Sequence, residues 1–372
     1  MKVAANDSIA HEIARVKAGL ALSGRIARDI SNLVDTSPVV LSDVKQLRAM
    51  SDRGARVAFG CKAIGEGMGT FETDAEAALA ERLFAQHGQV YGADAFADDP
   101  YLSRVQFASK DLGRFGLSWA FYEPYQLLTY DVSKWVPEHY LTAPCIAYFE
   151  KGFKFPCFFE GDDMWMSITP NEIVTMREPV ERAQGRVLTL GCGMGYYAYL
   201  AARKPEVESV TVIELERDVI DLFEQVIRPN LDCADKINVV QADAYEHMKM
   251  LPDGLYDYVF ADTWIGAGSV DEYLRMRSCC AHLRTTQVDY WIEDAFLNTL
   301  LRLVAYLIAD GYGEAAGVPD PALDHVGANL KRPFYRLRKM LSDVQVETAE
   351  DVQRLMTHDF VLSLLASPDF SY

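Results

Sequence analysis

The feature that most constrains this chain is a glycine turn at residues 191–195, which follows a strand-length apolar run at 187–190. The turn reads Gly191, Cys192, Gly193, Met194, Gly195. Glycines at alternate positions let the backbone bend sharply, and they leave amides open to a ligand that a Cβ atom would block. The pattern therefore predicts a buried strand, a tight turn and a helix beginning at residue 196, which together bind an adenosyl or nucleotide ligand.

From residue 185 onward, apolar runs alternate with amphipathic helices, which is typical of a parallel sheet covered by helices on both faces. Strands are predicted at 187–190, 209–213, 237–240, 256–261 and 288–292. Acids follow three of these strands, at Glu214, Asp243 and Asp262. Ligands of such sheets bind at the carboxyl ends of the strands, and an acid about 20 residues after a glycine turn accepts hydrogen bonds from ribose hydroxyls. We therefore predict an α/β, Rossmann-like fold, with Glu214 in the ribose position.

The rest of the chain is long enough to form more than one core, because half of its 372 residues are hydrophobic. We expect a mainly helical N-terminal domain at 1–143, β hairpins with a linking helix at 144–184, the Rossmann-like domain at 185–311, and a partly helical C-terminal extension at 312–372. Apolar stripes predict N-terminal helices at 9–33, 41–50 and 74–86. Aromatic residues crowd 101–140, and we interpret them as a core between domains or as the lining of a ligand pocket.

A strand-like period begins after Pro144. The segments 145–149 and 153–159 are separated by Glu-Lys-Gly, which predicts a hairpin, and 164–168 predicts a third strand. Thr169, Pro170 and Glu172 have the spacing of a capping box at the start of a helix that runs to residue 182. Contact with a ligand is the alternative role of Glu172, and we favour capping.

Four segments, at 190–195, 212–216, 242–244 and 256–262, resemble the motifs of class I S-adenosylmethionine-dependent methyltransferases. The resemblance covers residues 185–311. It implies that the glycine turn wraps the methionine part of S-adenosylmethionine and that Glu214 holds the ribose. It also implies that Leu215 packs on the adenine, that Asp243 and the Ala244 amide bind the adenine edge, and that Asp262 faces the reacting centre. The activity it implies is methyl transfer.

Within that superfamily the β hairpins and the spacing of Glu214, Asp243 and Asp262 are similar to those of the spermidine synthase group, but the chain departs from that group at two points. Met194 stands where those aminopropyltransferases carry an acid, and Thr263-Trp264 stands where they carry an acid and a proline. We therefore keep the architecture and favour methyl transfer, with an aminopropyltransferase-like enzyme as an alternative. A nicotinamide-binding fold is disfavoured because its third glycine would fall at Tyr196.

Methyl transfer depends mainly on in-line positioning of donor and acceptor and on excluding water. Asp262 is the candidate base for a hydroxyl or ammonium acceptor, and the alternative is that it only orients the cofactor. Glu293 and His282 are weaker candidates. We expect a small-molecule or peptide acceptor. The alternative from another class is a non-catalytic S-adenosylmethionine-binding protein that serves partner association.

Charge and composition restrict the partners. A net charge of -18 repels nucleic-acid phosphates, and the basic cluster within 331–339 is interpreted as a helix face. No secretory signal and no membrane-length apolar run are present, so we expect a cytoplasmic protein without membrane contact. The seven cysteines lack metal-binding spacing, and no metal is expected. A homodimer is among the expected assemblies.

The C-terminal extension leaves one expectation open. Class I methyltransferases usually close their sheet with an antiparallel hairpin, and no segment of 312–372 matches one. Three prolines lie between residues 319 and 333, and a helix is predicted at 349–365.

Overall fold

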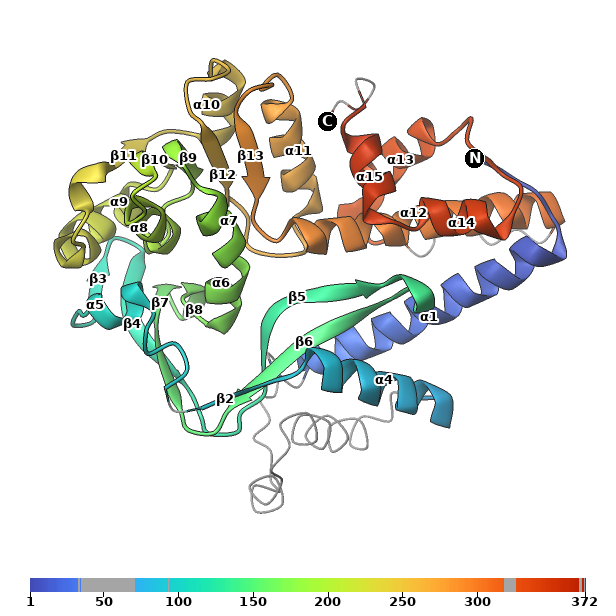
Figure 1. The fold of residues 1–372 in the computed structure, drawn as a ribbon, viewed down its shortest axis with the longest axis horizontal. Coiled ribbons are helices and arrows are strands. Elements are labelled where there is room, and N and C mark those ends of the chain that lie inside the picture. Colours follow the sequence, from blue (N-terminus) through green and yellow to red (C-terminus); the bar gives the residue numbers. More distant parts are fainter. Residues whose placement is uncertain (33, 35–70, 93, 318–325, 368–369, 371) are drawn as a thin grey trace.

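The computed structural model describes residues 1–32, 34, 71–92, 94–317, 326–367, 370 and 372 (Figure 1). The helix predicted at 41–50 lies outside these residues. Among the residues that are described, no helix is both long enough and apolar enough to cross a membrane.

A five-stranded parallel sheet forms the core of residues 185–290, in the order β11-β10-β9-β12-β13. The strands are β9 (Gly185–Leu190), β10 (Val207–Glu214), β11 (Ile237–Gln241), β12 (Tyr258–Ala261) and β13 (Gln287–Tyr290). The connecting helices are α8 (Tyr196–Ala202), α9 (Arg217–Leu222), α10 (Ala244–Met250) and α11 (Val270–Cys280). The predicted Rossmann-like fold and all five predicted strands are confirmed.

The strand order reverses direction at β9, because β10 and β11 extend the sheet on one side of it and β12 and β13 on the other. Leu190 at the end of β9 stands opposite Ile213 of β10 and Ala261 of β12. The three strands therefore end in register. In open α/β sheets such a switch point leaves a crevice beyond the carboxyl ends of the strands, and ligands bind there.

After β13 the chain enters a long helix, α12 (Glu293–Ala316), in place of the hairpin that usually closes this sheet. The helices α13 (Lys331–Met340), α14 (Ala349–Leu355) and α15 (His358–Leu365) follow it. The single helix predicted at 349–365 is thus broken, and the Thr357 side chain caps α15 by accepting a hydrogen bond from the Phe360 amide. The strand β14 (Gln345–Val346) pairs in parallel with β1 (Lys2–Val3). The N-terminal strand therefore lies beside the segment between α13 and α14 (Figure 1).

The first two long helices agree with the sequence. α1 (Asp7–Ser31) is capped by Asn6 and buries a stripe that includes Ile9, Ile13 and Val16, and α4 (Asp74–His87) is capped by Thr73. The segment after them differs, because β2 (Gln89–Tyr91), the short α5 (Pro100–Arg104), β3 (Lys110–Leu112), β4 (Phe115–Tyr122) and β5 (Leu128–Val136) are mostly strands. The expected mainly helical character is wrong for 110–136. The expected boundary at 143 also falls inside β6 (Leu141–Phe149).

The predicted hairpin across residues 150–152 is wrong, although both of its strands exist. β6 pairs with β2 and β5, whereas β7 (Phe153–Glu160) pairs with β4 and with β8 (Asp163–Ser167). The chain therefore forms a bent antiparallel ribbon, β4–β5 beside β6–β7, with residues 150–152 at the bend (Figure 1). A Cβ atom on Gly152 would lie 1.8 Å from the Phe121 ring, so the glycine makes room for that ring.

Two short helices, α6 (Pro170–Thr175) and α7 (Arg177–Arg182), lead from the ribbon into the sheet. The predicted helix at 170–182 thus begins and ends as expected but breaks at Met176. Thr169 is the N-cap residue, yet its side chain makes no capping hydrogen bond. The predicted capping box is therefore wrong, and Glu172 is left for another role. Shorter helical turns are η2 (Pro137–His139), η3 (Phe223–Ile227), η4 (Arg228–Asn230), η5 (Ala234–Lys236) and η7 (Ala328–Leu330).

Candidate functional site

A cavity of about 630 Å³ lies beyond the carboxyl ends of β9, β10 and β12, at the switch point of the sheet. Nine of the ten residues predicted to bind a cofactor line it. They are Gly191, Cys192, Gly193, Met194, Glu214, Leu215, Asp243, Ala244 and Asp262. The tenth, Gly195, is the N-cap residue of α8 and does not line the cavity. None of the aromatic residues of 101–140 lines this cavity.

The glycine turn needs glycine for two different reasons. Gly191 has φ +97°, and a Cβ atom there would lie 2.1 Å from the Asp262 carbonyl oxygen. This close approach joins the ends of β9 and β12. Gly195 has φ +71°, and a Cβ atom there would lie 2.3 Å from the Phe223 ring, so this glycine packs against the domain core and opens α8.

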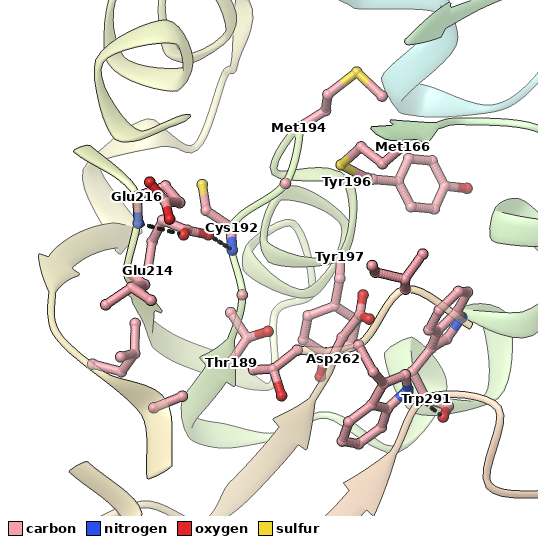
Figure 2. A pocket seen from close by; sticks show the side chains of 18 of the residues that line it. Met166, Thr189, Cys192, Met194, Tyr196, Tyr197, Glu214, Glu216, Asp262 and Trp291 are labelled. Atoms are coloured by element: carbon pink, nitrogen blue, oxygen red, sulfur yellow. Dashed lines mark hydrogen bonds between the residues drawn. The ribbon is translucent and has the colours of Figure 1, made fainter. Parts of the chain in front are cut away.

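Glu214 ends β10 and is buried. Figure 2 shows its carboxylate between two backbone amides: Oε2 accepts from the Cys192 amide at 2.9 Å and Oε1 from the Glu216 amide at 2.8 Å. The carboxylate therefore ties the glycine turn to the neighbouring strand. A carboxylate has about four lone-pair positions, so two backbone donors leave room for hydroxyl donors of a ligand.

Leu215, Asp243 and Ala244 also line the cavity. Asp243 caps α10, because its Oδ1 accepts from the Tyr245 amide at 2.8 Å and from the Glu246 amide at 3.1 Å. Leu215 is 57% exposed and presents an apolar surface. A fixed acid beside an exposed apolar side chain suits a flat ring with polar edges.

Two carboxyl groups face the other end of the cavity. Asp262 follows β12, and Glu172 comes from α6. Both side chains are partly exposed, and both line the cavity. Burial raises the pKa of Asp262 to about 7, and the charge of Glu214 adds to the rise. Burial also raises the pKa of Glu172 well above its usual value, and the charge of Asp262 adds to that rise.

Sequence reasoning favoured a capping role for Glu172 over its alternative, contact with a ligand, because the Thr-x-x-Glu pattern that suggests a cap also fits an acid turned into a cavity. It also missed the apolar walls, which include Trp165 and Met166 of β8 together with Trp264 and Trp291. The Trp291 ring is fixed by a 2.9 Å hydrogen bond from its Nε1 to the Thr175 hydroxyl. In Figure 2, Met166, Tyr196 and Met194 lie along one side of the view, while Asp262 and Trp291 lie on the other.

The N-terminal part of the chain holds the glycine turn from behind. Tyr101 of α5 is fully buried and donates a 2.7 Å hydrogen bond to the Met194 carbonyl. Tyr196, the first residue of α8, donates a 2.7 Å hydrogen bond to the Asp99 carboxylate. The conformation of the turn therefore depends on residues that precede the sheet by about ninety positions.

The weaker candidates have structural roles. Glu293 accepts a 2.6 Å hydrogen bond from the Tyr273 hydroxyl and pairs with Arg277, and neither Glu293 nor His282 lines the cavity. The His282 ring bonds to the Leu251 carbonyl at 2.7 Å. The six cysteines that the structure describes are free thiols, and five of them are buried. Within the described ranges, no three His, Cys, Asp or Glu residues are grouped as metal ligands.

Among known proteins, the chain shows similarity to solved structures alone. No family profile matches the sequence. No curated protein matches it either. Spermidine synthase from Thermotoga maritima is 13% identical, with 44% of this chain and 59% of that chain covered and a TM-score of 0.28. Precorrin-6Y C5,15-methyltransferase from Geobacter metallireducens is 19% identical, with coverages of 33% and 62% and a TM-score of 0.26.

A methyltransferase from Streptomyces caelestis is 21% identical, with coverages of 32% and 47% and a TM-score of 0.24. The chain thus spans less than two thirds of each of these three structures. Likeness of this strength says nothing about the activity of the chain. The fold class rests on its own strand order, and its role rests on the cavity.

Proposed function

We propose that the protein is an S-adenosylmethionine-dependent methyltransferase that acts on a small-molecule or peptide acceptor. The observation that carries the proposal is the buried Glu214 carboxylate, which spans the glycine turn and the end of β10 at the switch point of the sheet. An anionic acceptor of hydrogen bonds at this position suits the two hydroxyls of a ribose. The resemblance of the four sequence motifs supports the same cofactor.

The residues present fit that cofactor. The cavity volume of about 630 Å³ is within the range of small-molecule sites. The glycine turn would hold the methionine part and Glu214 the ribose. Leu215, Asp243 and Ala244 would hold the adenine. Bound here, the cofactor would supply an electrophilic methyl group on a sulfonium, directed to the end of the cavity where Asp262 and Glu172 lie.

The chain's own residues would then position the acceptor and manage its proton. Trp165, Trp264 and Trp291 line the cavity and would help to exclude water from a bound acceptor, which favours an in-line approach of acceptor and methyl group. Asp262, with a pKa near neutrality, is suited to accept a proton from a hydroxyl or an ammonium. Its alternative role is to orient the cofactor alone.

The first test is calorimetric titration with S-adenosylmethionine and S-adenosylhomocysteine. We expect both to bind, and Glu214→Ala should weaken binding by about 1–3 kcal/mol because a charged acceptor of hydrogen bonds is lost. Glu208→Ala is the matched control, since Glu208 is an exposed acid on the same strand. Unchanged affinity in Glu214→Ala would remove the ribose assignment.

Incubation with a methyl-labelled donor and a cell extract then tests the reaction itself. Transfer of label to an acceptor is expected. Cofactor binding without labelled product would favour the non-catalytic alternative. Failure of the folded protein to bind either compound at millimolar concentration would overturn the proposed function.

A further inference from the structure

Two carboxyl groups at the reacting end of the cavity differ from the other acids of the site in their lack of partners. Glu172 and Asp262 belong to different elements, α6 and the end of β12, and both line the same cavity. In the parts of the chain that the structure describes, neither side chain takes part in a hydrogen bond or an ion pair. Both acids are partly exposed, but acids inside a protein cavity normally have partners, so two unpaired acids in one cavity are unusual.

Among the described residues that line the cavity, none forms an ion pair with Glu172 or Asp262. The ionisable groups that line the cavity are Glu172, Cys192, Tyr196, Tyr197, Glu214, Glu216, Asp243, Tyr245, Asp262 and Arg275. Arg275 is the one cation among these described lining residues, and its guanidinium lies over the Tyr245 ring at 4.2 Å from the centroid. Arg177, on α7, interacts with the Tyr196 side chain from the adjoining cavity. Acids therefore dominate the reacting end.

Ionisation of both acids is disfavoured by burial and by a neighbouring negative charge. Burial and the charge of Asp262 raise the pKa of Glu172, while burial and the charge of Glu214 raise the pKa of Asp262 to about 7. Both groups therefore keep their protons to a higher pH than free carboxyl groups do. A bound cation close to them would reverse this balance, because an opposite charge favours the ionised carboxylate.

We propose that Glu172 and Asp262 form an acid pair that releases a proton when a sulfonium cation binds next to it, so that the site prefers the charged methyl donor over its neutral demethylated product. This inference rests on the proposed function. It gives Glu172 a role in the reaction, and it assigns the pair the task of distinguishing donor from product.

The proton balance closes over one turnover. Donor binding sends one proton from the pair to solvent and leaves a carboxylate beside the sulfonium. In the transfer step the carbon–sulfur bond breaks with its electron pair left on sulfur, and a bond forms between the methyl carbon and the acceptor atom. The acceptor's proton passes to the carboxylate. The pair is then protonated again beside a neutral thioether, which no longer attracts it, and product release is favoured.

The test is calorimetric titration of the intact chain at pH 7 with each compound, in buffers of low and high ionisation enthalpy. The difference in apparent binding enthalpy between the two buffers gives the number of protons released on binding. The wild-type protein should release more protons with S-adenosylmethionine than with S-adenosylhomocysteine. In Glu172→Gln and Asp262→Asn this excess should fall, and the preference for the donor should fall about tenfold, the change that one pKa unit produces.

Glu208→Gln is the matched control. Glu208 is an exposed acid on β10 and does not line the cavity. Its proton count and its donor preference should match those of the wild type. Both test variants replace an acid by its neutral isostere, and thermal unfolding of each variant checks that it folds.

The outcomes separate the two proposals. Equal proton release and equal preference in the wild type and both variants, with both compounds still bound, would overturn the acid pair and leave the proposed function standing. An excess of released protons that persists in both variants would place the proton on the ligand's own amino group, and this would also overturn the pair. Absence of binding in every variant would overturn both proposals.

Discussion

At the scale of single residues, the acids of the cavity behave differently because their partners differ. Glu214 receives two backbone N–H groups, so its negative charge is compensated where it stands. Asp262 receives none from the described part of the chain, although only β9 separates its strand from that of Glu214. A buried acid without donors is easier to protonate, and protonation states at a site can thus be set by a few amide groups. The cavity combines one fixed charge with two that respond to their surroundings.

Asp262 should make the stability of the protein decrease as pH rises. Its pKa is raised to about 7 in the folded state, so between its usual value near about 4 and about 7 the folded chain binds more protons than the unfolded chain. The free energy of unfolding contributed by this group therefore falls as pH rises through that window. Asp262→Asn should be more stable than the wild type at about pH 8, and the difference should shrink toward about pH 4.

Urea unfolding at a series of pH values measures this difference. Asp253→Asn is the control, because backbone amides at residues 284–286 hold the pKa of the exposed Asp253 well below its usual value. The difference in the free energy of unfolding between Asp253→Asn and the wild type should change only below about pH 4 and should be constant above it. A stability difference for Asp262→Asn that does not vary with pH would contradict the raised pKa.

At the scale of elements, the glycine turn is constrained from both sides. The Asp262 carbonyl lies against Gly191 on one side, and Tyr101 holds the Met194 carbonyl on the other. The turn therefore cannot move without disturbing β12 or α5. Such support from neighbouring elements is what keeps a ligand-binding loop in one conformation before its ligand arrives.

Gly191→Ala should therefore destabilise the protein more than an alanine at a glycine with positive φ but open surroundings would. Gly161, in the turn between β7 and β8, has φ +62° with no atom near an added Cβ, whereas the added Cβ at Gly191 would lie 2.1 Å from a backbone oxygen. Gly161→Ala should cost about 1 kcal/mol and Gly191→Ala about 1–3 kcal/mol more, because backbone cannot yield as a side chain does. Chemical denaturation of both variants measures this. Equal losses would show that the contact with Asp262 relaxes freely.

The elements also show what could be predicted from sequence. The parallel sheet followed from local patterns, since each strand is a short apolar run and each acid at a strand end follows it directly. The bent ribbon could not be predicted in this way. The Glu-Lys-Gly segment at 150–152 indicates that the chain changes direction, but it does not determine which strand pairs with β7. The predicted capping role of Glu172 was wrong for a related reason. Its spacing from Thr169 fits a cap, and only the fold turns it toward Asp262.

At the scale of the whole molecule, the N-terminal segment is joined to the region around β14 and α14. Besides the pairing of β1 with β14, the side chain of Asn6 donates to the Glu347 carbonyl at 3.1 Å. Glu12 of α1 is buried, and it accepts hydrogen bonds from Tyr140, from Arg15 and, at 3.1 Å, from Gln353 of α14. A single carboxylate thus connects the first helix, the tip of the ribbon and the C-terminal helices. These hydrogen bonds also hold the pKa of Glu12 below its usual value, against the effect of burial.

Glu12→Ala should therefore destabilise the protein by about 2 kcal/mol, the scale of hydrogen bonds to a charged group, and leave the buried Tyr140 hydroxyl unpaired. Glu81→Ala on α4 removes an exposed acid and should change stability by less than about 0.5 kcal/mol. Denaturant unfolding at neutral pH compares them. A loss for Glu12→Ala no larger than that of the control would show that the three connections are independent of this carboxylate.

The pairing of β1 with β14 has a consequence for biosynthesis. Lys2 and Val3 are translated more than three hundred residues before their partners Gln345 and Val346. Until those partners are made, the strand that precedes the first helix has no neighbour to pair with. Nascent chains of this protein should therefore depend on whatever shields this region until β14 has been translated.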